Sequence, residues 1–203
     1  MGWPVVPEAF DQLRPRPSLF VEQPGRLEEL ELRLLRQESR RYMRAELSEA
    51  ETVVLDTGFL GPLTYAAGLK HLGGYPDVLP RLIRETRSML VSGRWGFADL
   101  TVYLDVSPRL QRLRAQRAKE SHPESYAERH RRVGRWERRF WTTQVAPRLG
   151  RRFLRLDGRR SLPSLANAVA RFRRARDRQA PTEPGEVDSL LQLLAPGDTP
   201  RRR

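Results

Sequence analysis

Two short runs of apolar and β-branched residues, each containing a carboxylate near its end, are the clearest pattern along the chain. The first run spans residues 52–58 and carries Asp56, and the second spans residues 99–108 and carries Asp105. Strands buried on both faces of a parallel sheet are apolar almost throughout rather than alternating. The runs therefore predict parallel strands with Asp56 and Asp105 at the carboxyl ends, where open α/β sheets bind ligands.

Helical periodicity fills the segments around these strands. Residues 26–50 place Leu27, Leu30 and Leu34 on roughly one helical face, with charged residues around them. Asp77 is the expected N-cap of a helix over residues 77–92, and Ser107 is expected to cap the helix that begins at Pro108. The remaining predicted elements are helices over 62–72, 108–119, 124–140 and 162–174 and strands over 3–8 and 152–157.

The alternation of strands and helices predicts an α/β fold with three layers, a mainly parallel sheet flanked by helices. We expect one domain over residues 1–177. After Asp177 the composition changes to Pro, Gly, Glu, Asp and Arg. We therefore expect residues 178–203 to form a disordered basic tail, apart from a turn of helix over 187–194.

Composition narrows the class of protein. No apolar stretch approaches the roughly 20 residues that a membrane span needs, and the first residues do not resemble a secretory signal. The absence of cysteine excludes disulfides and thiolate metal sites. These features favour a cytoplasmic protein without membrane contact.

The formal net charge is +13, and because the chain has only two lysines, arginine carries it. A basic surface attracts anionic partners, which include both nucleotides and nucleic acid. A GC-rich genome would also enrich arginine codons. The charge alone does not separate these explanations.

The order of several features resembles the P-loop nucleoside and nucleotide kinases, with thymidylate kinase and the deoxynucleoside kinases as the nearest groups. The resemblance covers about residues 5–172. It depends on the following features in this order: a strand ending at Pro7-Glu8, a long helix with Gln37 and Arg40, a strand ending at Asp56, the segment Leu-Thr-Val-Tyr-Leu-Asp-Val-Ser-Pro over 100–108, an arginine-rich helix, and Asp157-Gly158-Arg159 after the last strand.

This resemblance implies a P-loop NTPase-like fold and a Mg²⁺-assisted transfer of the γ-phosphate of ATP to a nucleoside, nucleotide or similar small acceptor. A homodimer would be compatible with it. The family's Gly-x-x-x-x-Gly-Lys-Ser/Thr loop, which cradles the phosphates, has no counterpart in the chain, and Thr57 stands where the family commonly has arginine after the aspartate. The resemblance thus implies that the first strand, phosphate loop and first helix are missing.

Three explanations of that departure stay open: a start site placed too far downstream, a truncated gene, and a non-catalytic relative that has lost nucleotide binding. Because the backbone anion cradle is lacking, we expect this chain to bind ATP weakly or not at all.

Two carboxylates are candidates for the chemistry. By resemblance, Glu8 is the carboxylate that accepts the proton of the substrate hydroxyl, although it would also suit a helix N-terminus. Asp56 is the candidate catalytic carboxylate and Mg²⁺ ligand, although it would also suit a cap on the Gly58 turn. Asp105 is expected to act as a cap rather than a ligand.

The substrate side is expected to be formed by Gln37, Arg40 and Tyr65. Gln37 and Arg40 project from nearly the same helix face, and in deoxynucleoside kinases a similar amide and guanidinium pair reads the base and the sugar side of the substrate. A solvated helix face is the alternative interpretation of this polar spacing.

The arginine-rich helix over 124–140 resembles the lid of nucleotide kinases, which closes over the donor phosphates. Guanidinium groups match phosphate oxygens and can neutralise the charge that develops during transfer. On this basis Arg131 and Arg135 are candidate catalytic residues. Arg132, Arg138 and Arg139 are candidate ATP-binding residues, with an ordinary basic surface helix as the alternative.

A second function class remains open, in which the chain is a non-catalytic basic α/β protein that binds nucleic acid or another anionic partner. Such binding would weaken steeply with salt and would not depend on Asp56.

Overall fold

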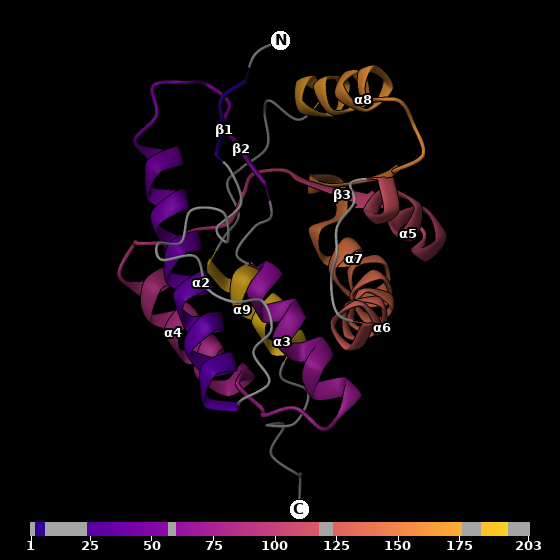
Figure 1. Ribbon diagram of the computed structural model, residues 1–203. Coiled ribbons are helices and arrows are strands. Elements are labelled where there is room, and N and C mark those ends of the chain that lie inside the picture. Colours follow the sequence, from indigo (N-terminus) through magenta and orange to yellow (C-terminus); the bar gives the residue numbers. More distant parts are fainter. Residues whose placement is uncertain (1–2, 7–23, 57–59, 118–123, 176–183, 195–203) are drawn as a thin grey trace, which may run out of the picture. The chain divides into compact units, whose positions relative to one another are not determined.

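The computed structural model describes residues 3–6, 24–56, 60–117, 124–175 and 184–194 (Figure 1). The chain divides into two compact units. The first contains residues 1–97 and 191–203, and the second contains residues 98–190. The predicted domain end at residue 177 stays a prediction.

The first unit contains a parallel pair of strands joined through a long helix. Strand β1 (Val5–Val6) pairs with β2 (Val54–Leu55), with Val5 opposite Val54. Helix α2 (Pro24–Glu46) lies between them in the sequence. The parallel pairing confirms the prediction for this part of the sheet, since parallel strands need a crossover connection of this length.

Two further helices, α3 (Leu60–Leu72) and α4 (Leu79–Val91), pack against α2 and against each other. Helix α4 buries one stripe at helical spacing, whereas α3 buries most of the residues between Leu60 and Leu69 and is therefore covered on several sides. The buried core residues of the three helices include Leu27, Leu30, Leu35, Leu63, Leu69, Leu79, Leu82 and Ile83.

Helix α4 begins later than the sequence pattern predicts, and the prediction of Asp77 as its N-cap is wrong. The N-cap position is held by Val78, without a side-chain cap, and Pro80 lies in the first turn. The carboxylate of Asp77 pairs instead with Lys70 Nζ at 2.7 Å. Proline suits the first turn of a helix because its missing N–H is not needed there, and it sets this start.

The second unit contains another parallel pair, β3 (Thr101–Asp105) and β4 (Phe153–Asp157), in which Asp105 lies opposite Asp157. Between the two strands the chain forms α5 (Pro108–Arg117), α6 (Glu124–Phe140), a π-helical segment (Trp141–Val145), α7 (Ala146–Leu149) and a short 3₁₀ turn (Gly150–Arg152). Helix α8 (Leu162–Arg174) follows β4, with the bounds that the sequence predicts.

Residues near the C-terminus form more helix than predicted. Helix α9 (Pro184–Leu194) has eleven residues, where the sequence indicates a turn at 187–194. Its apolar residues Val187, Leu190, Leu191 and Leu194 are buried. Burial of this stripe stabilises a helix that its own length would leave marginal in water.

The described residues therefore form an α/β structure with two separate parallel pairs of strands. The mixed α/β class and the parallel pairing are confirmed, while the three-layer P-loop type stays a prediction. Among the described residues, none of the helices is both long enough and apolar enough to cross a bilayer.

Candidate functional site

The carboxyl ends of β1 and β2 are joined by a buried arginine. Arg41 of α2 is fully buried, and its Nη2 donates to the carbonyl oxygens of Val6, at 2.8 Å, and of Asp56. Its Nη1 donates to both carboxylate oxygens of Glu38, each at 2.6 Å. The guanidinium supplies donors that the last carbonyls of a two-stranded pair would otherwise lack.

Asp56 lies where the sequence predicts it, directly after β2. Its backbone N–H donates to the carbonyl of Val6 at 3.3 Å, and its residue is exposed. The Arg41 contact fixes the backbone of Asp56 and leaves the carboxylate to solvent. A single exposed carboxylate is a suitable donor for Mg²⁺, which commonly takes one or two carboxylates together with substrate phosphates.

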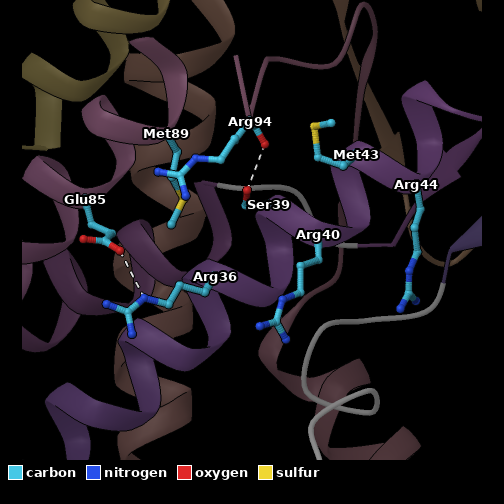
Figure 2. Close-up of a pocket in the computed structure, with 8 residues that line it drawn as sticks. All are labelled: Arg36, Ser39, Arg40, Met43, Arg44, Glu85, Met89 and Arg94. Atoms are coloured by element: carbon cyan, nitrogen blue, oxygen red, sulfur yellow. Dashed lines mark hydrogen bonds and ion pairs between the residues drawn. The ribbon is translucent and has the colours of Figure 1, made fainter. Parts of the chain in front are cut away.

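A cleft of about 450 Å³ lies along α2 and α4 in the first unit (Figure 2). This volume falls in the range of small-molecule sites, about 300–1,000 Å³. Eight residues line it: Arg36, Ser39, Arg40, Met43, Arg44, Glu85, Met89 and Arg94. Four of them carry a guanidinium group and one carries a carboxylate, so the lining is strongly positive.

Several contacts hold the walls of the cleft. Arg36 Nε pairs with Glu85 Oε1 at 3.0 Å, which links α2 to α4. The buried Ser39 donates from Oγ to the carbonyl of Arg94 at 2.8 Å, and Arg94 Nε donates to Ser92 Oγ at 2.9 Å. The segment that follows α4 is therefore fastened to α2 at the edge of the cleft.

The predicted substrate residues divide between the cleft and its surroundings. Arg40 lines the cleft and its Nη1 lies 3.5 Å from the Oε1 of Gln37, which is buried and is not a lining residue. Tyr65 is half-buried on α3 and is not a lining residue. The structure thus brings Gln37 and Arg40 together and leaves Tyr65 apart from the cleft.

In the second unit, Asp105 is bound by two arginines, so the prediction that it acts as a cap is wrong. Arg138 of α6 donates from Nε to Oδ1 at 2.7 Å, and Arg155 of β4 donates from Nε to Oδ2 at 2.9 Å. The hydrogen bond from Arg138 is the main reason that the pKa of Asp105 is lowered, and Arg155 adds to it. Ser107 caps α5 instead, accepting from the N–H of Leu110 at 3.3 Å.

Three aromatic rings stack beside this carboxylate. The centroid of Tyr103 lies 5.8 Å from that of Trp141 and 6.2 Å from that of Phe153. The π-helical segment carries Trp141, and such segments recur at functional sites. Burial first, and then the nearby Asp105 charge, raise the pKa of Tyr103 to about 12, so its hydroxyl stays protonated at neutral pH.

The arginines of α6 differ in their surroundings. Arg138 is held by Asp105, and Arg131 pairs with Glu128 at 2.7 Å one helical turn away. The remaining candidates, Arg132, Arg135 and Arg139, are exposed. Their spacing of three and four residues places them on one face of the helix.

Some of the predicted features have no counterpart among the residues that the structure describes. Glu8 and Thr57 lie outside the described residues. Within the described residues, no group of three or more acidic or histidine side chains comes together as a metal site. Asp56 is therefore the one candidate Mg²⁺ ligand among the residues that were predicted and are described.

Sequence reasoning missed Arg36, Arg41, Arg44 and Arg94. The spacing of Arg36, Arg40 and Arg44, four residues apart, could have indicated a row of guanidinium groups on one helix face. Nothing in the local pattern distinguishes Arg41, whose partners are set by the fold. In comparisons with protein-family models, curated proteins and solved structures, nothing matches the chain.

Proposed function

We propose that the chain is a phosphotransferase of the nucleoside and nucleotide kinase type, in which the α2–α4 cleft holds the acceptor. The observation that carries this proposal is the cleft itself: a cavity of about 450 Å³ lined by four arginines, along the helix whose Arg41 holds the backbone of Asp56. Parallel strands ending at Asp56 and Asp105 support the same fold type, a three-layer P-loop-like domain.

In this proposal Asp56 holds Mg²⁺, which when bound neutralises the charge of the donor phosphates. Arg41 acts as a positioning residue, because it fixes the carbonyl of Asp56 rather than reaching a ligand. Arg40, which lines the cleft, and Arg41, which holds Asp56, are separated by about 100° around α2. The cleft and Asp56 therefore lie against neighbouring faces of this helix. The acceptor would therefore need to present its reacting oxygen around the flank of α2.

The test is the transfer of labelled γ-phosphate from ATP to a panel of nucleosides and nucleoside monophosphates with Mg²⁺. We expect slow transfer, because the sequence has no phosphate-binding glycine loop. Asp56→Ala should lower the rate at least tenfold, whereas Asp77→Ala, which changes an exposed carboxylate elsewhere in the unit, should not. Transfer that Asp56→Ala leaves unchanged would overturn the proposal, and so would the absence of transfer at millimolar acceptor.

A second candidate function is supported by the exposed face of α6. Arg132, Arg135 and Arg139 lie together there, in a chain with a net charge of +13. A non-catalytic protein that binds nucleic acid through this face would lose affinity steeply with salt, with a slope set by the phosphates it neutralises. Filter binding of single-stranded DNA separates the two functions. It compares the variant in which all three of these arginines are changed to glutamine with the variant Asp56→Ala.

A further inference from the structure

Strand β3 has a free edge. Its sheet has two strands, so within the described part of the chain one edge of β3 pairs with β4 and the other pairs with no strand. The N–H of Gly158 donates to the carbonyl of Asp105 at 3.0 Å, which shows that the backbone groups of Asp105 face β4. Because the N–H and C=O of successive residues in a strand point to opposite edges, those of Val102 and Leu104 point to the free edge. No described residue is hydrogen-bonded to them there.

This edge is accessible and has none of the usual protection. Leu104 is 48% exposed and Val102 is half-buried. Folded proteins commonly protect an edge strand with lysine, proline or a bulge, because its unpaired backbone groups form hydrogen bonds with other chains. Residues 101–104 of β3, Thr-Val-Tyr-Leu, contain neither charge nor proline. The other strand differs, because the exposed Arg155 lies at the centre of β4. The free edge of β3 is therefore suited to pairing with a further strand.

The two faces beside this edge differ in chemistry. Side chains alternate along a strand, so Val102 and Leu104 lie on one face while Tyr103 and Asp105 lie on the other. Arg138 and Arg155 cover Asp105, each through Nε and Nη2, and their side chains are 46% and 51% exposed. Each guanidinium keeps its Nη1 for a further carboxylate. An added strand would thus meet an apolar face on one side and two cations on the other.

Charge also distinguishes between the possible occupants of the edge. A second copy of the chain would bring a net charge of +13 against +13, which opposes association. An acidic segment would instead be attracted by the same charge. The edge therefore favours a partner of opposite charge over self-association.

We propose that the free edge of β3 binds an extended segment of a partner protein, in which apolar and acidic residues alternate, as an added strand. The backbone groups of Val102 and Leu104 hydrogen-bond to the segment. Its apolar side chains cover Leu104, and its acidic side chains lie on the opposite face, toward Arg138. This binding is separate from phosphate transfer, because none of these residues lines the α2–α4 cleft.

Fluorescence anisotropy with the full chain tests the proposal. The probe is a labelled peptide of about eight alternating valine and glutamate residues, long enough to cover β3, and the matched control has lysine in place of glutamate. We expect the glutamate peptide to bind at least about tenfold more tightly than the lysine peptide. Equal binding of the two peptides, or no measurable binding of the glutamate peptide, would overturn the proposal.

Methylation of the peptide backbone separates strand addition from simple charge attraction. In an extended peptide the valine amides point to one edge and the glutamate amides to the other. We compare a peptide N-methylated at its valines with one N-methylated at its glutamates, since both keep all side chains. One of them should lose at least about tenfold in affinity, because its donors toward β3 are removed, and the other should lose less than about threefold. Equal losses would show that backbone pairing does not hold the peptide.

A pair of variants locates the binding at the edge of β3. Val102→Pro removes an N–H that points to the free edge, so the ladder with β4 is kept, whereas Val102→Ala keeps this N–H. Circular dichroism establishes that each variant is folded. Peptide affinity should fall at least about tenfold in Val102→Pro and less than about threefold in Val102→Ala. A folded Val102→Pro that binds as well as Val102→Ala would overturn the proposal, and if Val102→Pro does not fold, the two methylated peptides decide.

Discussion

Arg41 connects helix α2 to the ends of both strands in the first unit. It is fully buried, pairs with the buried Glu38, and donates to the carbonyls of Val6 and Asp56. Arg41→Met would remove the guanidinium that pairs with the buried Glu38 carboxylate, and breaking a buried pair in this way costs about 3–5 kcal/mol in comparable cases. We expect urea unfolding to show a loss of this size.

Two variants control that measurement. Arg40→Gln, one residue away and exposed, should change the unfolding free energy by less than about 0.5 kcal/mol. The double variant Glu38→Leu with Arg41→Met should recover part of the loss, because an apolar pair needs no compensating charge. If the double variant were no more stable than Arg41→Met, the buried charge would not be the cause.

Asp105 makes the stability of the second unit depend on pH. Arg138 and Arg155 hold its pKa below the ordinary value of about 3.9. The carboxylate therefore contributes stability above about pH 4, and this contribution is lost as the pH falls through the lowered pKa. Asp105→Asn should destabilise by about 1.5–3 kcal/mol at pH 7, the range for hydrogen bonds to a charged group.

Unfolding measured from pH 7 down to pH 3 should show the difference between wild type and Asp105→Asn narrowing on the acid side. Asp157→Asn serves as a comparison, because that carboxylate is held by the exposed Arg159. A difference for Asp105→Asn that stays constant across this range would show that the ion pairs do not carry it.

At the scale of elements, two glycines of the second unit should respond oppositely to alanine. Gly134 lies within α6, and a Cβ there meets no atom within 4 Å. Gly134→Ala should stabilise the helix by about 0.5–1 kcal/mol, since glycine loses more backbone entropy. A Cβ on Gly158 would lie 2.6 Å from Val106 Cγ2, so Gly158→Ala should destabilise by about 1–3 kcal/mol.

Thermal unfolding of the two variants checks this pair. Because both carry the same change, any effect of the substitution on the unfolded chain should be similar in each. Shifts of the same sign and size would show that the close approach after β4 does not constrain Gly158.

The elements themselves were largely predictable, because their signals are local. Ser161 accepts a hydrogen bond from the N–H of Ser164 and caps α8, and the helix bounds agree with the sequence. The start of α4 was not predicted correctly, since Asp77 has the right side chain for a cap but pairs with Lys70. The capping preference of a residue is a tendency, and a competing partner in the fold overrides it.

At the scale of the whole molecule, the net charge of +13 should make stability rise with salt. Self-repulsion destabilises a compact state of high net charge, and salt screens it within a Debye length of about 10 Å at 0.1 M. Exposed pairs such as Arg36 with Glu85 would weaken, but each contributes only about 0–1 kcal/mol.

We expect the thermal midpoint to rise as sodium chloride is raised from about 20 mM to about 300 mM, because the Debye length shortens over this range. In a second variant, the three exposed arginines of α6 at 132, 135 and 139 are changed to glutamine. Its thermal midpoint should be higher at low salt and should rise less as salt is added. A midpoint that falls steadily with salt would show that attractive pairs outweigh the repulsion.

The site was predicted in part. Asp56 follows β2 as expected, and Arg40 lines the cleft with Gln37 beside it, because strand ends and helix faces can be read from spacing. The contacts of Arg138 and Arg155 with Asp105 join residues 33 and 50 positions apart, and Ser39 reaches Arg94 across 55 positions. No pattern within one segment records which distant segment it will meet.

The sequence by itself determined the alternation of helices and strands, the parallel class of the strands and the excess of positive charge. These follow from periodicity and composition, which act within a few residues or on the chain as a whole. Only the tertiary structure decided that Arg41 is buried against Glu38, that Asp105 receives two guanidinium groups, and that arginines of α2 share a cleft with Arg94. Those outcomes depend on packing between elements, where burial and geometry choose one partner among many of equal charge.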